Sequence, residues 1–158
     1  MKTLSTRFIL LFLLFSGNVM SQPFTSPGLF HVIRLTPGSD LKKSLMDYAK
    51  TNQLSAVGVV SCTGSLKQGN LRFADAKEGS VFDGKWEIVS LTGTFNSESG
   101  HFHLSISDST GKTIGGHLLD GCLIYTTAEL ILVELPQLDF KRTQDSQTGY
   151  KELDPVQK

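Results

Sequence analysis

Three of the four histidines in this 158-residue chain, His101, His103 and His117, lie close together in the sequence. Neutral imidazole is a good ligand for zinc, iron and other first-row metals, at bond lengths of about 2.0–2.1 Å for zinc. Three histidine ligands leave a fourth position for water or another group, which is typical of catalytic rather than closed structural sites. The residue types therefore predict a divalent metal site, zinc or iron. The alternative is two solvent-facing strand residues and a third that packs against a neighbour.

A β-hairpin would bring these imidazoles together. Polar and apolar side chains alternate over residues 101–107, as in a strand with one buried face. Residues 108–112 (DSTGK) fit a three-residue hairpin loop with Gly111 in the left-handed region. This loop pairs His103 with His117 and keeps the apolar side chains on one face, whereas a two-residue loop would mix both faces. We expect the three histidines on one face, with the Cβ atoms of the facing pair about 4.5–5.5 Å apart.

A second hairpin would add hydroxyl groups beside the histidines. Residues 86–95 (WEIVSLTGTF) also alternate, and residues 96–100 form a turn toward the histidine strand. In that pairing Thr92 lies opposite His103 and Thr94 opposite His101, with Ser90 on the same face. We expect these three hydroxyl groups to hydrogen-bond around the metal ligands or to line a pocket.

Two adjacent glycines, Gly115 and Gly116, would face Ser105 and Leu104 in the first hairpin. Because glycine has no Cβ, another backbone or a bulky group can approach closely there. Simple packing, a subunit contact and a ligand pocket would each use this space.

The composition argues against some classes of function. The chain is 39% hydrophobic and 19% charged, with a formal net charge of zero and the length of one domain. The absence of a basic block argues against a nucleic-acid partner, because phosphate contacts need cationic side chains. The sequence has no Gly-rich phosphate loop, no Gly-Xaa-Ser-Xaa-Gly motif and no obvious general base beside the histidines.

The first 21 residues predict a signal peptide. Lys2 and Arg7 precede an apolar run that is too short to span a bilayer, and Val19 and Ser21 suit the −3 and −1 positions of a cleavage site. We expect a signal peptide over residues 1–21, a short linker over 22–29, and a secreted or secretory-lumen protein without a membrane anchor after cleavage. The alternatives are a mitochondrial presequence, or a start at Met20 that leaves a cytosolic protein.

Cys62 and Cys122 both lie in apolar, strand-like sequence. They would form a disulfide in an oxidising compartment, or remain as two buried free thiols.

The remaining pattern predicts an α+β domain over residues 30–138. Ser39 is the expected N-cap of one main helix, in which apolar residues recur at helical spacing from Leu41. We expect a mainly antiparallel sheet of about six or seven strands. The strands would cover residues 30–35, 54–62 (buried on both faces), 71–74, 86–95, 101–107 and 123–135, with a turn at 67–70, a loop at 75–83 and a loosely held polar tail at 139–158.

The order of several short motifs resembles the plants-and-prokaryotes conserved domain, PPC or PCC, also known as DUF296. The matching segments are 34–41 (RLTPGSDL), 64–66 (GSL), 87–94 (EIVSLTGT), 101–105 (HFHLS), Asp108 with 111–112 (GK), 114–117 (IGGH), 126–129 (TTAE), and Arg142 with 148–149 (TG). The resemblance covers about residues 30–150. It implies a mixed α/β fold that assembles into homotrimers and, for the histidine-bearing prokaryotic type, a metal near the histidines.

Plant members of the family join this domain to an AT-hook, and prokaryotic members are often described as predicted DNA-binding proteins. Here the Arg-Gly-Arg-Pro core of an AT-hook is missing. The plant partner-contact signature Gly-Arg-Phe-Glu-Ile corresponds to Gly84, Lys85, Trp86, Glu87 and Ile88, with two of its five positions changed.

We therefore expect a trimeric binding and assembly module with a histidine metal site that contacts protein partners. A metal-dependent enzyme that activates water is the alternative, and a DNA-binding protein is a weaker one.

Overall fold

The computed structural model describes residues 23–158. The expected signal peptide, residues 1–21, lies outside the described residues. Within residues 23–158, no helix is long and apolar enough to cross a membrane.

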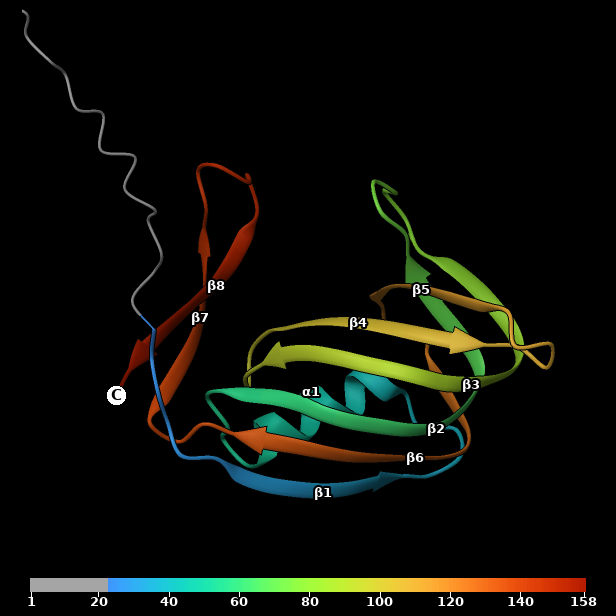
Figure 1. The fold of residues 1–158 in the computed structure, drawn as a ribbon, viewed down its shortest axis with the longest axis horizontal. Coiled ribbons are helices and arrows are strands. Elements are labelled where there is room, and N and C mark those ends of the chain that lie inside the picture. Colours follow the sequence, from blue (N-terminus) through green and yellow to red (C-terminus); the bar gives the residue numbers. More distant parts are fainter. Residues whose placement is uncertain (1–22) are drawn as a thin grey trace, which may run out of the picture.

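The main body is a six-stranded antiparallel sheet with the order β1-β6-β2-β3-β4-β5 (Figure 1). Its strands are β1 (Leu29–Leu35), β2 (Val57–Arg72), β3 (Ser80–Phe95), β4 (Gly100–Ser107), β5 (Thr113–Leu118) and β6 (Leu123–Glu134). The end of β2 also pairs with β5, through Leu71 with Leu118 and Arg72 with His117, so that β2, β3, β4 and β5 close into a ring. The predicted α+β class with a mainly antiparallel sheet is confirmed.

The predicted helix is α1 (Leu41–Thr51), and it packs on one face of the sheet through Leu41, Leu45 and Ala49. Its N-cap is Asp40 rather than Ser39. One carboxylate oxygen of Asp40 accepts from the Lys43 backbone N–H at 3.0 Å, and the other accepts from the Gly121 N–H at 2.6 Å. Asp40 therefore caps the helix and ties it to the loop before β6.

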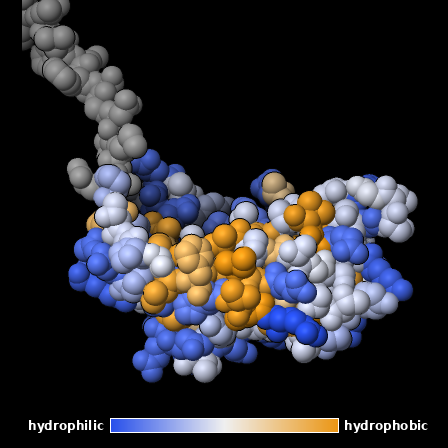
Figure 2. Space-filling view, turned by 60° about the horizontal axis from the view of Figure 1, so that its bottom comes forward, coloured by the Kyte–Doolittle hydropathy of each residue, from blue (hydrophilic) through white to orange (hydrophobic). Residues whose placement is uncertain are grey.

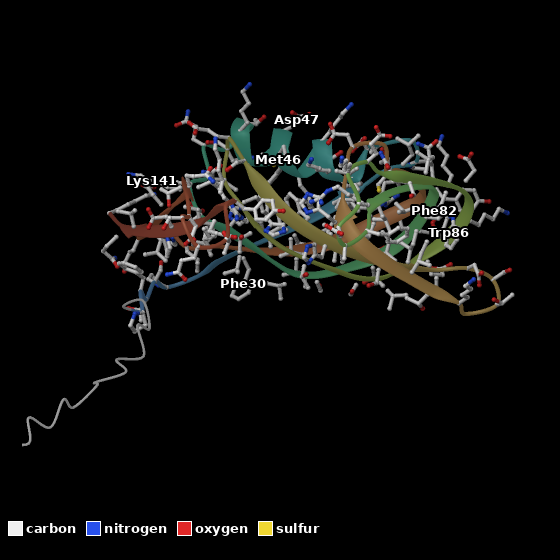
Figure 3. All side chains as sticks on the ribbon, turned by 90° about the horizontal axis from the view of Figure 1, so that it is seen from above. Phe30, Met46, Asp47, Phe82, Trp86 and Lys141 are labelled. Carbon is white, nitrogen blue, oxygen red and sulfur yellow. The ribbon has the colours of Figure 1, made fainter. Side chains whose placement is uncertain are left out.

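Two faces of the sheet differ in character. Ile33 and Leu35 of β1 pack into the core on the helix side, while Phe30 and Val32 point the other way and are 68% and 79% exposed. Figure 2 shows apolar side chains gathered on the side of the molecule where β1 lies. In Figure 3, Phe30 projects from the opposite side of the sheet to the helix that carries Met46 and Asp47. We name Phe30, Val32, Val60 and Ile131 the β1–β6 patch.

Strands β2 and β3 are longer than the sequence predicted. The expected turn at residues 67–70 is a β-bulge inside β2, because pairing with β3 shifts register between Leu66 and Gln68 and then continues. A Cβ on Gly69 would lie 2.9 Å from Ile106 Cδ1, so this glycine permits close packing and does not mark a turn. The expectation that residues 54–62 are buried on both faces is also wrong, since Val60 is exposed.

The tail over residues 139–158 is ordered, which corrects the expectation that it is loosely held. β7 (Leu138–Gln144) and β8 (Lys151–Gln157) form a two-stranded antiparallel sheet. Leu138 and Phe140 pack against Ala56, and the Phe140 N–H donates to the Ser55 carbonyl at 2.9 Å. These contacts fix the β7–β8 hairpin to the main body.

The two cysteines are free, buried thiols, so the disulfide alternative is wrong. Cys122 Sγ lies 3.1 Å from the backbone N of Asn70, whereas Cys62 lies eight residues before Asn70 on β2. That separation is roughly 25 Å along a strand, and a disulfide requires Cα atoms within about 4.4–6.8 Å. Burial raises the pKa of Cys62 to about 12 and that of Cys122 to about 11, which keeps both thiols protonated at neutral pH.

Candidate metal centre

The register predicted for the β4–β5 hairpin is confirmed. His103 pairs with His117 and Leu104 with Gly116. The Asp108 N–H donates to the Lys112 carbonyl at 3.0 Å, and Gly111 has φ +81°, as the three-residue loop requires. Because Phe102 and Leu104 are buried in the core, the histidines that alternate with them lie on the outer face of β4.

The predicted pairing of β3 with β4 is confirmed around the site. Thr92 pairs with His103, Thr94 with His101 and Ser90 with Ser105. Beyond Ser90 a bulge moves the register by one residue, so that Ile88 is buried and Val89 is exposed. The bulge explains why strict alternation fails at this end of β3.

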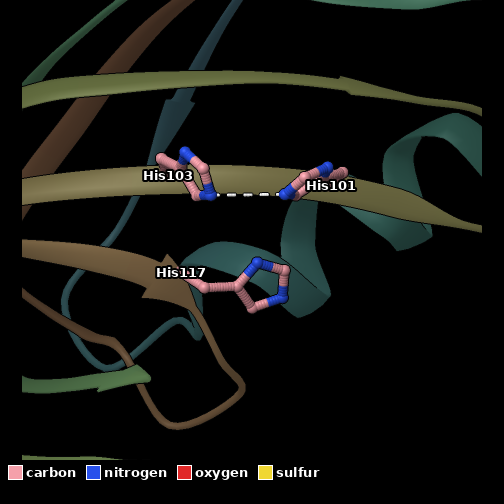
Figure 4. Close-up of side chains that lie close together, drawn as sticks. All are labelled: His101, His103 and His117. Atoms are coloured by element: carbon pink, nitrogen blue, oxygen red, sulfur yellow. Dashed lines mark hydrogen bonds between the residues drawn. The ribbon is translucent and has the colours of Figure 1, made fainter. Parts of the chain in front are cut away.

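The three imidazoles converge on one region of space (Figure 4). The Nε2 atoms of His101 and His103 are 3.2 Å apart, and each histidine offers a ring nitrogen within 4.8 Å of the others. Metal–nitrogen bonds of about 2.0–2.1 Å in a tetrahedral site place two ligand nitrogens about 3.3 Å apart. The spacing of His101 and His103 therefore matches one edge of such a site.

The surroundings favour neutral imidazoles. Burial, Arg72 and His101 lower the pKa of His117 to about 4. Burial, His103 and Arg142 lower the pKa of His101 below its ordinary value. A metal ligand must carry a free lone pair, so neither ring needs to lose a proton at neutral pH before it binds a cation. Three imidazole nitrogens are a donor set that could hold a metal ion.

Most of the expected pocket residues lie beside the histidines. A cavity of about 470 Å³ includes His103 and His117 together with Ser90, Thr92, Gly115 and Gly116. Thr94 lies in a separate recess with His101 and His103, and its hydroxyl accepts from Arg142 at 3.0 Å instead of bonding a histidine.

Gly116 has a packing role. A Cβ there would lie 2.8 Å from the carbonyl oxygen of Arg72, so glycine lets the end of β2 reach β5. This approach places Arg72 beside His117.

A second cavity, of about 480 Å³, contains functional groups that the sequence did not reveal. It lies between His101, His117 and the β7–β8 hairpin, and it is lined by Arg72, Arg142, Tyr150, Lys151 and Glu152 as well. Arg72 was expected in a short return strand and the others in a loose tail. Only the pairing of β2 with β5 and the folding of the β7–β8 hairpin bring them to the histidines.

The signature at residues 84–88 lies elsewhere on β3. Lys85 Nζ sits 5.0 Å from the centre of the Tyr125 ring, Trp86 packs edge-on against Phe82, Glu87 is exposed and Ile88 is buried. None of the cavities beside the histidines includes a residue of this signature.

Comparison with known proteins agrees with this architecture. The chain is 43% identical over 133 residues to the bifunctional protein GlmU of Synechococcus sp. (strain JA-3-3Ab), covering 84% of this chain but only 21% of that relative's length. A hypothetical protein from Salmonella cholerae-suis superposes with a TM-score of 0.84 at 37% identity, covering 85% of this chain and 97% of that one.

A metal-containing protein from Archaeoglobus fulgidus shares the fold, with a TM-score of 0.71 at 22% identity over 85% of this chain and 99% of that one. The model of the Plants and Prokaryotes Conserved (PCC) domain matches residues 23–136. The chain therefore belongs to the Plants and Prokaryotes Conserved domain family.

Proposed function

We propose that this protein is a homotrimeric binding and assembly module that holds a divalent metal ion, zinc or iron, on His101, His103 and His117. The observation that carries the proposal is the convergence of three imidazoles with nitrogens within 4.8 Å of one another. The fold shared with a protein named as metal-containing is consistent with it. When bound, the metal would polarise the oxygen atoms of a ligand at its open position.

The β1–β6 patch supports self-association. Val32 pairs directly with Ile131 across β1 and β6, so their exposed side chains are neighbours on one face of the sheet. Contiguous apolar surface of this kind marks sites of protein association. We assign the patch to contact between copies of this chain, and the signature at residues 84–88 to contact with other protein partners.

Residues 1–21 are proposed to direct the chain to the secretory pathway.

Metal analysis tests the metal site. Purified protein exposed to zinc or iron and then gel-filtered should retain one metal ion per chain. His103→Ala should lose the ion without unfolding, because His103 is exposed. His31→Ala is the matched control: His31 bonds Tyr48 and Glu134, away from the cluster. A metal-free wild type, or equal retention in His103→Ala, would refute the site.

One observation favours the alternative of a metal-dependent enzyme. Glu152 lines the same cavity as His101 and His117 and supplies the carboxylate that was missing beside the histidines in the sequence. It could accept a proton from a bound ligand. If this function is correct, turnover of p-nitrophenyl phosphate or p-nitrophenyl acetate should be lost in both Glu152→Gln and His103→Ala. Absence of turnover in the wild type leaves the binding module as the better description.

A further inference from the structure

We infer that the cavity between the histidines and the β7–β8 hairpin binds a small ligand through an oxyanion, a carboxylate or a phosphate group, held by Arg72 and Arg142. The inference deepens the proposed function, because it rests on the same histidine site and names the chemical class of its ligand.

The two arginines are held in place from different elements. Arg72 ends β2 and pairs with His117, and its Nη1 donates to the Ala76 carbonyl at 3.4 Å. Arg142 lies on β7, and its Nη2 donates to the hydroxyl of Thr94 at 3.0 Å and to the Thr94 carbonyl at 3.4 Å. The cavity is therefore bounded by one guanidinium from the main sheet and one from the C-terminal hairpin.

Both guanidinium groups retain donors for a ligand. Each has five N–H donors, and the bonds above occupy a single nitrogen of each group. Among residues 23–158, the side-chain ion pairs involve neither arginine. The planar array of N–H groups on arginine matches the oxygens of a carboxylate or phosphate in a two-point hydrogen bond.

The net positive charge of the cavity also favours the binding of an anion. Arg72, Arg142 and Lys151 line it, against a single carboxylate, that of Glu152. A divalent metal on the histidines would add two more positive charges. Cations this close repel one another, and a bound oxyanion would offset that repulsion.

The size and position of the cavity suit a small molecule. Its volume of about 480 Å³ lies within the range of about 300–1,000 Å³ typical of small-ligand sites. A three-histidine site leaves a coordination position open, so an oxygen of the same anion could reach the metal while the arginines hold the remaining oxygens.

Calorimetric titration of metal-loaded protein with inorganic phosphate and with malonate tests the inference, and the tighter of the two probes identifies the class of oxyanion. Arg72→Gln and Arg142→Gln should each weaken binding by about 10- to 100-fold, the usual effect of losing hydrogen bonds to a charged group. Arg34→Gln, which removes the same charge from an exposed position on β1, should leave binding unchanged. In cobalt(II)-loaded protein, visible absorption should change when either anion binds.

The outcomes separate this inference from the metal site. Two results would overturn the oxyanion site alone, provided that the protein retains its metal. Either the wild type binds neither anion, or both arginine variants bind the anions as tightly as the wild type does. If the chain retains no metal, the same titration is carried out on the metal-free protein. Binding that falls in Arg142→Gln would then support the cavity, and no binding would overturn it.

Discussion

At the scale of single residues, the histidine cluster combines two opposing effects. Partial burial and the nearby arginines keep His117 and His101 neutral, which prepares them to bind a cation. The same environment makes their protonation in the folded state unfavourable. The site should therefore be tuned for metal binding at neutral pH at the expense of acid stability.

The metal-free protein should lose stability as the pH falls from about 6.5 toward 4. The pKa of His117 is about 4 in the folded state against 6.5 in its ordinary state, so between these values the unfolded chain binds more protons. Discounted for solvent exposure, the loss should be about 1 kcal/mol, or about 4 °C in Tm.

Thermal unfolding of wild type and of His117→Asn across this pH range measures the effect. Carboxylates also titrate there, so the difference between the two proteins is the relevant quantity. His117→Asn should have the shallower dependence on pH, and parallel curves would contradict the assignment.

At the scale of secondary-structure elements, the closure of β2 onto β5 depends on one glycine. Gly116→Ala would place a methyl group 2.8 Å from the Arg72 carbonyl oxygen, a backbone atom that cannot move without breaking the pairing. We expect a loss of about 1–3 kcal/mol, as for other overpacked sites, with weaker metal retention because His117 follows directly.

Gly115→Ala is the matched control for this substitution. Its nearest neighbour would be the Ser105 hydroxyl at 2.7 Å, which can rotate away. Denaturant unfolding of both variants decides the point, and equal stabilities would show that closure of the ring does not depend on Gly116.

The elements that the sequence predicted best are those with regular alternation of polar and apolar side chains and recognisable turn residues. The β4–β5 register followed from alternating side chains and from a loop in which Gly111 has positive φ. The sequence did not predict that β2 is continuous, because residues 67–70 resemble a turn. In the structure, Gly69 instead allows close packing against Ile106. β7 and β8 were missed because few of their residues are buried, so apolar alternation is weak. The convergence of the histidines was therefore predictable, and the position of Arg72, Arg142 and Glu152 beside them was not.

At the scale of the whole molecule, the proposed assembly depends on the β1–β6 patch. Four apolar side chains from three strands are exposed there. Phe30 projects from the sheet face opposite the helix (Figure 3). In a monomer this surface would be hydrated at a cost of about 25 cal/mol per Å² of apolar area, which association would recover.

Val32→Asp should convert the proposed trimer into monomers. Val32 is the most exposed apolar residue of the patch and pairs with Ile131, so an aspartate there would bury a charge without a partner at the subunit contact. Val81→Asp is the control, because Val81 is also exposed but lies near the start of β3, outside the patch. Sedimentation should give three times the mass of one chain for the wild type and Val81→Asp, and a single chain's mass for Val32→Asp. A monomeric wild type would contradict the proposed assembly. A trimeric Val32→Asp would show that the subunit contact lies on another face, and it would leave the proposal for the histidine site unchanged.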